Sequence, residues 1–316
     1  GHGGDPAIAL RLAGALWPFW HMRGQYQEGH GWLERAIAQA GQVDPAARAQ
    51  AFLTLANIAN NLEDHAHARS LYGESLHICE EIGDDRGVAS ATIGLGMVAT
   101  NTGDYDRAEK LLDEALERCQ ALASPATVTC LFGLGQLAIA RGDADAAERW
   151  LDEAREMCGP NAVVPLAYLA MESARIARYR GDLIVAGEQA AACLGTFREI
   201  GERRAEATSL TELGHIDLLT GNLDAAGDRF REAAARNLEM RAELGLVTCL
   251  EGLACIAVAR GDVSQAAHLG GSAAAWRDRV GTARTVPERE MFDTTMANAR
   301  SADPDRFDAA WRAGAR

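Results

Sequence analysis

Apolar and polar residues alternate with helical spacing along most of the chain. In "TGDYDRAEKLLDEAL" (102–116), apolar residues stand at 108, 111, 112, 115 and 116, as on one face of an amphipathic helix. A more uniformly apolar stretch, "VASATIGLGMVATN" (88–101), precedes it, and a Gly-Asp pair separates the two. The pattern predicts two helices joined by a short turn, and turn signals elsewhere are likewise separated by helical pattern, so no strand is predicted.

The turn recurs at a fixed interval. The position of Gly103 repeats at 24, 63, 103, 142, 181, 221 and 261, in steps of 39 or 40 residues. A period of this size indicates a solenoid of helix pairs. Glycine suits the left-handed residue that ends a first helix, and the following Asp or Asn can cap the second. We therefore expect Asp104 to be a helix cap and not part of a ligand loop.

Small and large residues also recur at fixed offsets from this turn. An alanine follows it in six copies (Ala68, Ala108, Ala147, Ala186, Ala226 and Ala266), with a small residue twelve positions earlier and usually a bulky one four positions later. This pattern resembles the tetratricopeptide repeat, in whose motif Leu95-Gly96, Tyr105, Ala108 and Ala115 fill signature positions. The period here is longer than the ~34 residues usual in that family.

The expected fold is all-α, a right-handed superhelical solenoid of about seven such helix pairs over residues 1–280. Capping helices should follow over residues 281–316, because solenoids need to cover their last apolar face. Asp303-Pro304 is a good helix start, and Phe307 and Trp311 are spaced to pack on the last repeat.

Further stretches of the sequence resemble one particular group of proteins that contain such repeats. Three stretches resemble the sensor region of large bacterial ATPase-containing transcription regulators, similar in plan to the maltose regulator of enteric bacteria. They are "LRLAGALWPFWHMRGQYQEGHGWLERAIA" (10–38), "EEIGDDRGVASATIGLGMVATNTGDYDRAEKLLDEAL" (80–116) and the tail over 266–314, which begins "AAHLGGSAAAWRDRVG". The resemblance implies a cytoplasmic protein whose partners are an upstream nucleotide-binding domain and possibly a DNA-binding domain. It also implies a peptide, protein or small-molecule inducer. Neither a G-x-x-x-x-G-K-[ST] loop nor a basic helix-turn-helix occurs in this sequence.

Family geometry places the ligand in a concave groove lined by the first helix of each pair. Read onto this sequence, the groove positions that we select are Asn57, Asn60, Asn61, Asn101, Gln136, Tyr168, Met171, Arg175, Arg178, Tyr179, Thr211, His215 and Glu251. Amides suit a peptide backbone or a polar molecule, and the guanidinium forks of Arg175 and Arg178 suit a carboxylate or phosphate. The alternative is that these side chains are simply solvated.

The first pair is rich in aromatic residues, among them Trp17, Trp20 and Trp32. They form either a bulky N-terminal cap or the interface to an upstream domain.

Composition limits the function further. The net charge of −14 argues against direct nucleic-acid contact, and no run approaches the ~20 apolar residues that span a membrane. Seven scattered cysteines fit small core residues, and the histidines lack metal-ligand spacing. We expect no cofactor, no metal and no enzymatic activity. The predicted function is signal binding that controls a transcription regulator; the alternative is a protein–protein scaffold attached to a kinase, cyclase or other effector.

Overall fold

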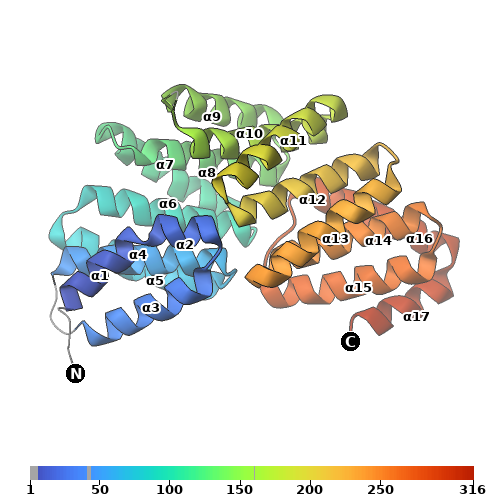
Figure 1. Ribbon diagram of the computed structural model, residues 1–316, viewed down its shortest axis with the longest axis horizontal. Helices are drawn as coiled ribbons and strands as arrows, with labels where there is room; N and C mark the ends of the chain where they lie inside the picture. The colour runs from blue at the N-terminus through green and yellow to red at the C-terminus, as the bar shows by residue number, and fades with distance from the viewer. Residues whose placement is uncertain (1–5, 41–43, 160) are drawn as a thin grey trace. The chain divides into compact units, whose positions relative to one another are not determined.

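The computed structural model describes residues 6–40, 44–159 and 161–316, and this part of the chain is helical throughout (Figure 1). The first helices of the pairs are α1 (Pro6–Ala15) with α2 (Trp17–Arg23), α4 (Pro45–Asn61), α6 (Asp85–Asn101), α8 (Ala126–Arg141), α10 (Val163–Arg180), α12 (Arg203–Leu219) and α14 (Glu243–Ala259). The second helices are α3 (Tyr26–Gln39), α5 (His65–Ile82), α7 (Tyr105–Ala121), α9 (Ala144–Met157), α11 (Leu183–Ile200), α13 (Leu223–Met240) and α15 (Val263–Val280). Two more helices follow, α16 (Val286–Ala302) and α17 (Pro304–Gly314). The predicted all-α fold of sequential antiparallel pairs is confirmed.

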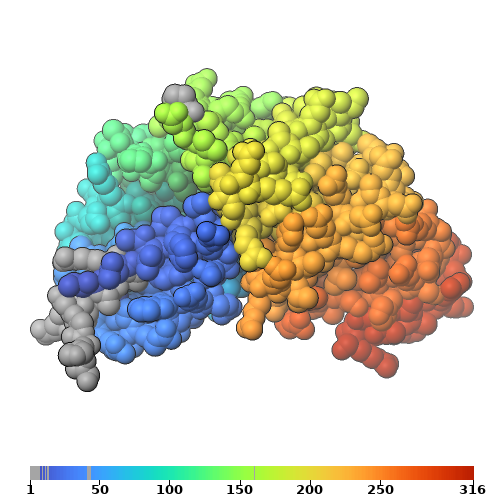
Figure 2. Space-filling model, in the orientation of Figure 1, coloured from blue at the N-terminus to red at the C-terminus, as the bar shows by residue number. Residues whose placement is uncertain are grey.

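The chain forms two compact units. Unit 1 comprises Gly1–Leu137 and Arg149–Gly159, and unit 2 comprises Ala138–Glu148 and Pro160–Arg316, so the division passes through α8 and α9. Within each unit, side chains fill the space between neighbouring helices (Figure 2). The predicted boundary between repeats (1–280) and capping helices (281–316) does not coincide with the boundary between these units. It stays a prediction.

Helix pairs pack through the predicted small and large residues. The six alanines after the turn are fully buried: Ala68, Ala108, Ala147, Ala186, Ala226 and Ala266. The bulky residue four positions later lies between successive first helices. A Cβ atom added to Gly214 would be 2.9 Å from the Phe230 ring, and one added to Gly252 would be 2.4 Å from it. The glycines therefore allow Phe230 to fill the space between α12 and α14.

The turn after each first helix has the expected left-handed residue. Gly103 has a φ of 82°, and Glu63 keeps a φ of 66° at the same position although it is not glycine. A second left-handed series, which the sequence did not reveal, ends several second helices. It includes Ala123 at 45° and Arg241 at 56°, where a side chain is sterically disfavoured.

The capping residues follow the prediction only in part. Asp143 accepts a hydrogen bond from the Ala146 N–H at 2.9 Å, and Asp262 accepts one from the Gln265 N–H at 3.0 Å. Asp104 is the N-cap residue of α7 as predicted, but its side chain accepts no hydrogen bond from the first turn of this helix. It is exposed, so water can solvate the carboxylate instead.

The last two helices, α16 and α17, pack mainly on the preceding helix pair and less on each other. Helix α17 begins after Asp303, whose carboxylate accepts a hydrogen bond from the Arg306 N–H at 3.2 Å. Its Trp311 lies against Gly270 of α15, as the sequence predicted. Helix α16 packs on α14 and α15 through Phe292 and Met296, and its first turn reaches α10 through side chains described below.

Substituting Gly252→Ala should destabilise unit 2 by about 1–3 kcal/mol, because the new methyl group would overlap the packed Phe230 ring. Gly195→Ala is the matched control, since nothing lies within 4 Å of its Cβ position in α11. That substitution should be neutral or stabilising by up to about 1 kcal/mol, because alanine favours helix. Urea unfolding followed by circular dichroism measures both, and equal effects would contradict the packing described here.

Substituting Arg241→Gly should stabilise the chain by roughly 0.5–1 kcal/mol, because the exposed Arg241 has a left-handed backbone that glycine adopts without steric cost. Arg241→Ala keeps that cost and should show no gain. The same unfolding measurement compares the two variants, and a gain in the alanine variant as large as in the glycine variant would contradict the explanation.

Candidate functional site

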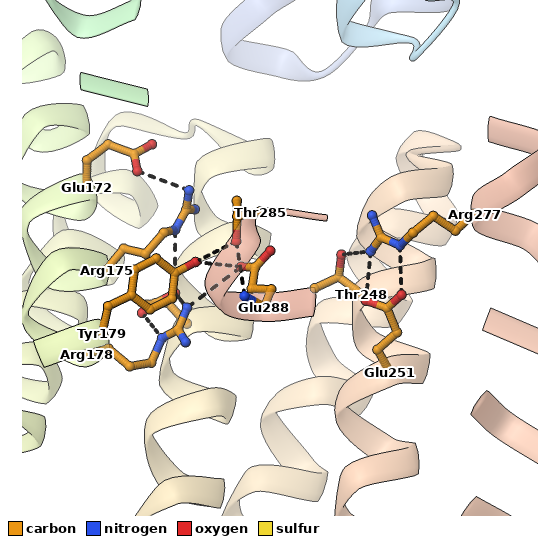
Figure 3. Close-up of polar contacts among 10 residues, drawn as sticks. Glu172, Arg175, Arg178, Tyr179, Thr248, Glu251, Arg277, Thr285 and Glu288 are labelled. Atoms are coloured by element: carbon orange, nitrogen blue, oxygen red, sulfur yellow. Dashed lines mark hydrogen bonds and ion pairs between the residues drawn. The ribbon is translucent and has the colours of Figure 1, made fainter. Parts of the chain in front are cut away.

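Charged side chains are buried together on the first helices of unit 2. We define the buried charge network as Glu172, Arg175, Arg178 and Tyr179 of α10, Glu212 and His215 of α12, and Thr285 and Glu288 at the start of α16. Figure 3 labels its members from α10 and from the start of α16. Burying an ion costs several kcal/mol unless another charge compensates it. The pairing within this network is therefore its main feature.

Arg178 is the centre of the network. Its Nε donates to Glu212 Oε1 at 2.5 Å and its Nη2 donates to Oε2 at 3.2 Å, so one carboxylate takes both donors. The same guanidinium lies 4.5 Å from the centre of the Tyr179 ring. Arg175 forms an ion pair with Glu172 at 3.0 Å. α10 and α12 are thus joined by a desolvated, bidentate ion pair.

Glu288 adds a carboxylate from outside the helix pairs. The Tyr179 hydroxyl donates to Glu288 Oε1 at 3.1 Å and lies 3.1 Å from Thr285 Oγ1, and Arg178 Nη2 is 3.8 Å from Glu288 (Figure 3). Thr285 is the N-cap of α16, and its hydroxyl accepts the Glu288 N–H at 3.3 Å. The sequence Thr-x-x-Glu has the spacing of a capping box. In this protein the Thr285 hydroxyl caps the helix, and the Glu288 carboxylate contacts α10.

The arginines keep these carboxylates ionised. Burial would raise the pKa of Glu212, but the charge of Arg178, its hydrogen bonds and the charge of Arg175 lower it overall. Burial acts the same way on Glu288, yet Arg175 and Arg178 lower its pKa from 4.5 to about 2. Burial would lower the pKa of Arg178, but the charge of Glu212, together with its hydrogen bonds and the charges of Tyr179 and Glu288, raises it overall. The site is therefore built to hold negative charge.

His215 is buried and has no hydrogen bond. Its relative exposure is 5%, and neither ring nitrogen has a hydrogen-bond partner among the described residues. Its ring meets the Phe230 ring edge to face, with centroids 5.1 Å apart. Burial, and then the charge of Arg178, lower the pKa of His215 from 6.5 to about 4. The imidazole is thus neutral at pH 7, with an unused donor and acceptor.

A second ion cluster surrounds Glu251 of α14. Arg277 of α15 donates to both carboxylate oxygens at 2.7 Å, and Arg284 Nε donates to one of them at 2.9 Å. Arg284 stands just before Thr285, so the segment 284–288 contacts α14 through Arg284 and α10 through Glu288.

The predicted amides of unit 1 also come together. Asn101 Nδ2 of α6 donates to Asn60 Oδ1 of α4 at 3.3 Å. Asn57 Oδ1 accepts from the Tyr72 hydroxyl at 2.6 Å, and Asn61 Nδ2 donates to the Asn57 carbonyl at 2.8 Å. All four amides are half-buried. Asn60 and Asn101 therefore pair with each other, whereas Asn57 pairs with Tyr72 and Asn61 bonds the backbone of its own helix.

The remaining predicted groove residues lie apart from these groups. The Tyr168 ring packs on the Phe197 ring at 5.1 Å, and Met171 is buried in the same apolar cluster. Thr211 donates to the Ala207 carbonyl at 3.0 Å, as threonines in helices commonly do. Gln136 is half-buried on α8.

The predicted interface tryptophans differ in exposure. Trp20 is 3% exposed and packs on Gly29, Trp17 is half-buried, and Trp32 is 54% exposed with Arg35 over its ring at 5.9 Å. Of the three, Trp32 presents its ring to solvent on unit 1.

The acidic partners of these arginines were not predicted from the sequence. Glu172 and Glu212 each stand two residues before the small residue of a first helix, at equivalent positions in successive pairs. That repeated charge was the available signal. Glu288, by contrast, lies 109 residues from Tyr179 in sequence, and only its capping-box spacing marked it.

The described part of the chain shows neither a metal-binding cluster nor a membrane-spanning helix. Residues 6–40, 44–159 and 161–316 hold no group of three or more His, Cys, Asp or Glu side chains placed to bind a metal ion. Over the same ranges, no helix combines the length and apolarity needed to cross a membrane.

Comparison with known proteins identifies the repeats. The tetratricopeptide repeat family matches residues 46–120 and, overlapping, 87–158. Residues 46–158 are tetratricopeptide repeats. The same arrangement of buried alanines and antiparallel pairs continues through α15, so the tetratricopeptide-like architecture extends beyond the matched residues. No curated protein matches the chain significantly.

Solved tetratricopeptide-type structures resemble the chain at low identity. A Rap conjugation gene regulator of plasmid pLS20, in complex with the Phr* peptide, is 12% identical with a TM-score of 0.67, over 87% of this chain and 75% of that one. A Rap protein complexed with competence and sporulation factor is 11% identical with a TM-score of 0.55, over 95% and 99%. A signal transduction ATPase with a tetratricopeptide repeat sensor, from Pyrococcus horikoshii, is 17% identical with a TM-score of 0.53, over 88% and 42%. These similarities show the fold.

The stability of unit 2 should fall as pH falls from 6.5 towards 4. His215 has a folded pKa of about 4, below the 6.5 of the unfolded chain, so the unfolded chain binds a proton that the folded chain does not. The stabilisation is complete above pH 6.5, and its loss by pH 4 amounts to about 3 kcal/mol. Glu288 contributes in a separate window, between its unfolded value of 4.5 and about 2.

Urea unfolding of wild type and His215→Gln at pH 7 and pH 4.5 tests this. The variant should lose less stability on acidification than wild type. His77→Gln is the control, because the His77 side chain is 68% exposed and its loss should change nothing. Parallel losses in wild type and His215→Gln would show that His215 is not the titrating group.

Proposed function

We propose that the chain is a sensor region that binds a polar signal on its first helices and passes the signal to an attached effector domain. The observation that carries the proposal is the buried charge network. Apolar residues of similar volume stabilise a protein interior as well as or better than buried ion pairs. Two successive pairs nevertheless place carboxylates and arginines on this face, at the cost of desolvating them.

The structural comparisons favour a signalling role. Two similar structures are Rap proteins, one in complex with the Phr* peptide and one with competence and sporulation factor. A third is a signal transduction ATPase with a tetratricopeptide repeat sensor, of which this chain covers 42%. By analogy, the effector would be a nucleotide-binding domain, with a DNA-binding domain as a further partner, in a cytoplasmic transcription regulator.

The proposed mechanism is a population shift. A ligand changes an equilibrium only if it binds one arrangement more tightly than another. Side chains of α10, α12 and α16 meet in the network, so a ligand that exchanges partners there favours one packing of these helices. The packing change then alters the activity of the attached domain.

Binding, and not catalysis, is the proposed chemistry. Burial raises the pKa of Cys130 to about 12 and that of Cys193 to about 11, so these thiols stay protonated and poorly nucleophilic. Arginines keep Glu212 and Glu288 ionised, which makes them poor proton donors.

Affinity enrichment tests the proposal. Wild-type chain, Arg175→Gln, Asn101→Ala and Arg231→Gln would each be immobilised and exposed to extract of the native host, and retained peptides and small molecules identified by mass spectrometry. Arg231→Gln is the control, because this side chain of α13 is 61% exposed and pairs with Asp228. We expect a retained molecule that wild type and the control hold and that at least one first-helix variant loses by tenfold or more, since one lost charged contact costs about 1.4 kcal/mol or more.

Equal retention of every molecule by all four proteins would contradict a first-helix binding site. Retention of proteins alone, with no peptide or small molecule, would favour the scaffold function instead.

A further inference from the structure

Of the two carboxylates that lie beside Arg178, that of Glu288 is the one that a ligand could replace more easily. The Glu212 side chain is 5% exposed and takes two hydrogen bonds from Arg178, at 2.5 and 3.2 Å. The Glu288 side chain is 27% exposed, lies 3.8 Å from Arg178 and accepts from the Tyr179 hydroxyl at 3.1 Å. The carboxylate that comes from outside the helix pairs is thus held more loosely than the one between them.

The position that Glu288 occupies attracts an anion. Although burial opposes ionisation there, the charges of Arg175 and Arg178 lower the Glu288 pKa to about 2. Any carboxylate placed at the same point would experience the same field and could accept the same Tyr179 hydrogen bond. The recognition elements belong to α10 and stay in place if Glu288 leaves.

Unused polar groups adjoin this position. Neither ring nitrogen of His215 has a hydrogen-bond partner among the described residues, although the side chain is buried. Arg175 Nε is likewise buried without a hydrogen bond in the described structure, and it lies 3.9 Å from Glu212 Oε2. Buried polar groups are normally satisfied, so these donors fit a further ligand group beside the carboxylate.

We propose that Arg175, Arg178 and Tyr179 form a subsite for a carboxylate group of the signal, and that Glu288 occupies this subsite in the ligand-free chain. The inference rests on the proposed sensor function and names its ligand class. Entry of the ligand carboxylate releases Glu288 and so frees the first turn of α16 from α10. Helix α16 remains attached through Phe292 and Met296.

Chemical rescue tests the subsite directly. In Glu288→Ala the internal carboxylate is missing, and acetate should fill its place. We expect acetate to raise the Tm of this variant above its value in chloride at equal ionic strength, by about 3 °C at ten times Kd. Glu290→Ala, two residues further along the same helix and exposed, is the control and should show no such difference. Tyr179→Phe added to Glu288→Ala should reduce the shift, because the hydroxyl donor is gone.

Two further ligands distinguish the source of the carboxylate. Glutarate represents a small organic acid, and acetyl-trialanine represents a peptide C-terminus, with its C-terminal amide as control. Tighter binding of glutarate to Glu288→Ala assigns a small acid, and tighter binding of the peptide acid assigns a peptide. Equal binding of the peptide acid and its amide, together with no binding of glutarate, would overturn the proposal.

Identical Tm values in acetate and chloride would also overturn it. If Glu288→Ala does not fold, Glu288→Gln keeps the side-chain volume and should show a smaller acetate-specific rise, whose absence has the same meaning. A further outcome is that acetate fails to raise the Tm of Glu288→Ala while Arg175→Gln still fails to retain a molecule that wild type retains from the extract. Those two results together would contradict the carboxylate subsite but would not contradict the sensor function.

Discussion

The close approach of the two helices in each pair is the constraint on which the rest of the structure depends. It requires a small residue wherever the helices cross, and the six alanines after the turn are accordingly fully buried. The contact fixes the rotation of each first helix. Residues at the same offset from the crossing therefore share a face in successive pairs, which places Glu172 and Glu212, and likewise Arg175 and His215, at equivalent points of α10 and α12.

That shared face carries a second constraint, because charges removed from water need partners. Arg178 meets Glu212 across the pairs, and removal of either would leave a buried ion, typically at a cost of about 3–5 kcal/mol. The exchangeable part of the network is Glu288, which the first turn of α16 presents to Tyr179. A fixed ion pair and a displaceable carboxylate thus stand side by side, which suits a site that must remain folded while its ligand changes.

Much of the fold could be predicted from the sequence because its determinants are local. The turn spacing, the buried alanines and the bulky residues that face glycine repeat every 39 or 40 residues, and each acts within one or two helix pairs. The left-handed residues Ala123 and Arg241 escaped prediction because they are not glycine. Asp104 was assigned as a cap from its position alone, but its side chain is exposed and accepts no hydrogen bond from α7.

Only part of the candidate site could be predicted from the sequence: residues on α10 and α12, but not the partner on α16. Face geometry selected Arg175, Arg178, Tyr179 and His215, which the structure brings together. It did not select Glu288, because that contact depends on how α16 packs after the last pair and spans 109 residues of sequence. The amides Asn60 and Asn101 were chosen as ligand contacts, and their hydrogen bond across 41 residues was not foreseen.

The most direct test of the central claim, that an internal carboxylate stands where a ligand carboxylate binds, is a crystal structure of Glu288→Ala grown in acetate. We expect an acetate ion that accepts a hydrogen bond from the Tyr179 hydroxyl and lies beside the Arg178 guanidinium. Water alone at this position, or the Tyr179 and Arg178 side chains moved together to close it, would show that no such carboxylate subsite exists.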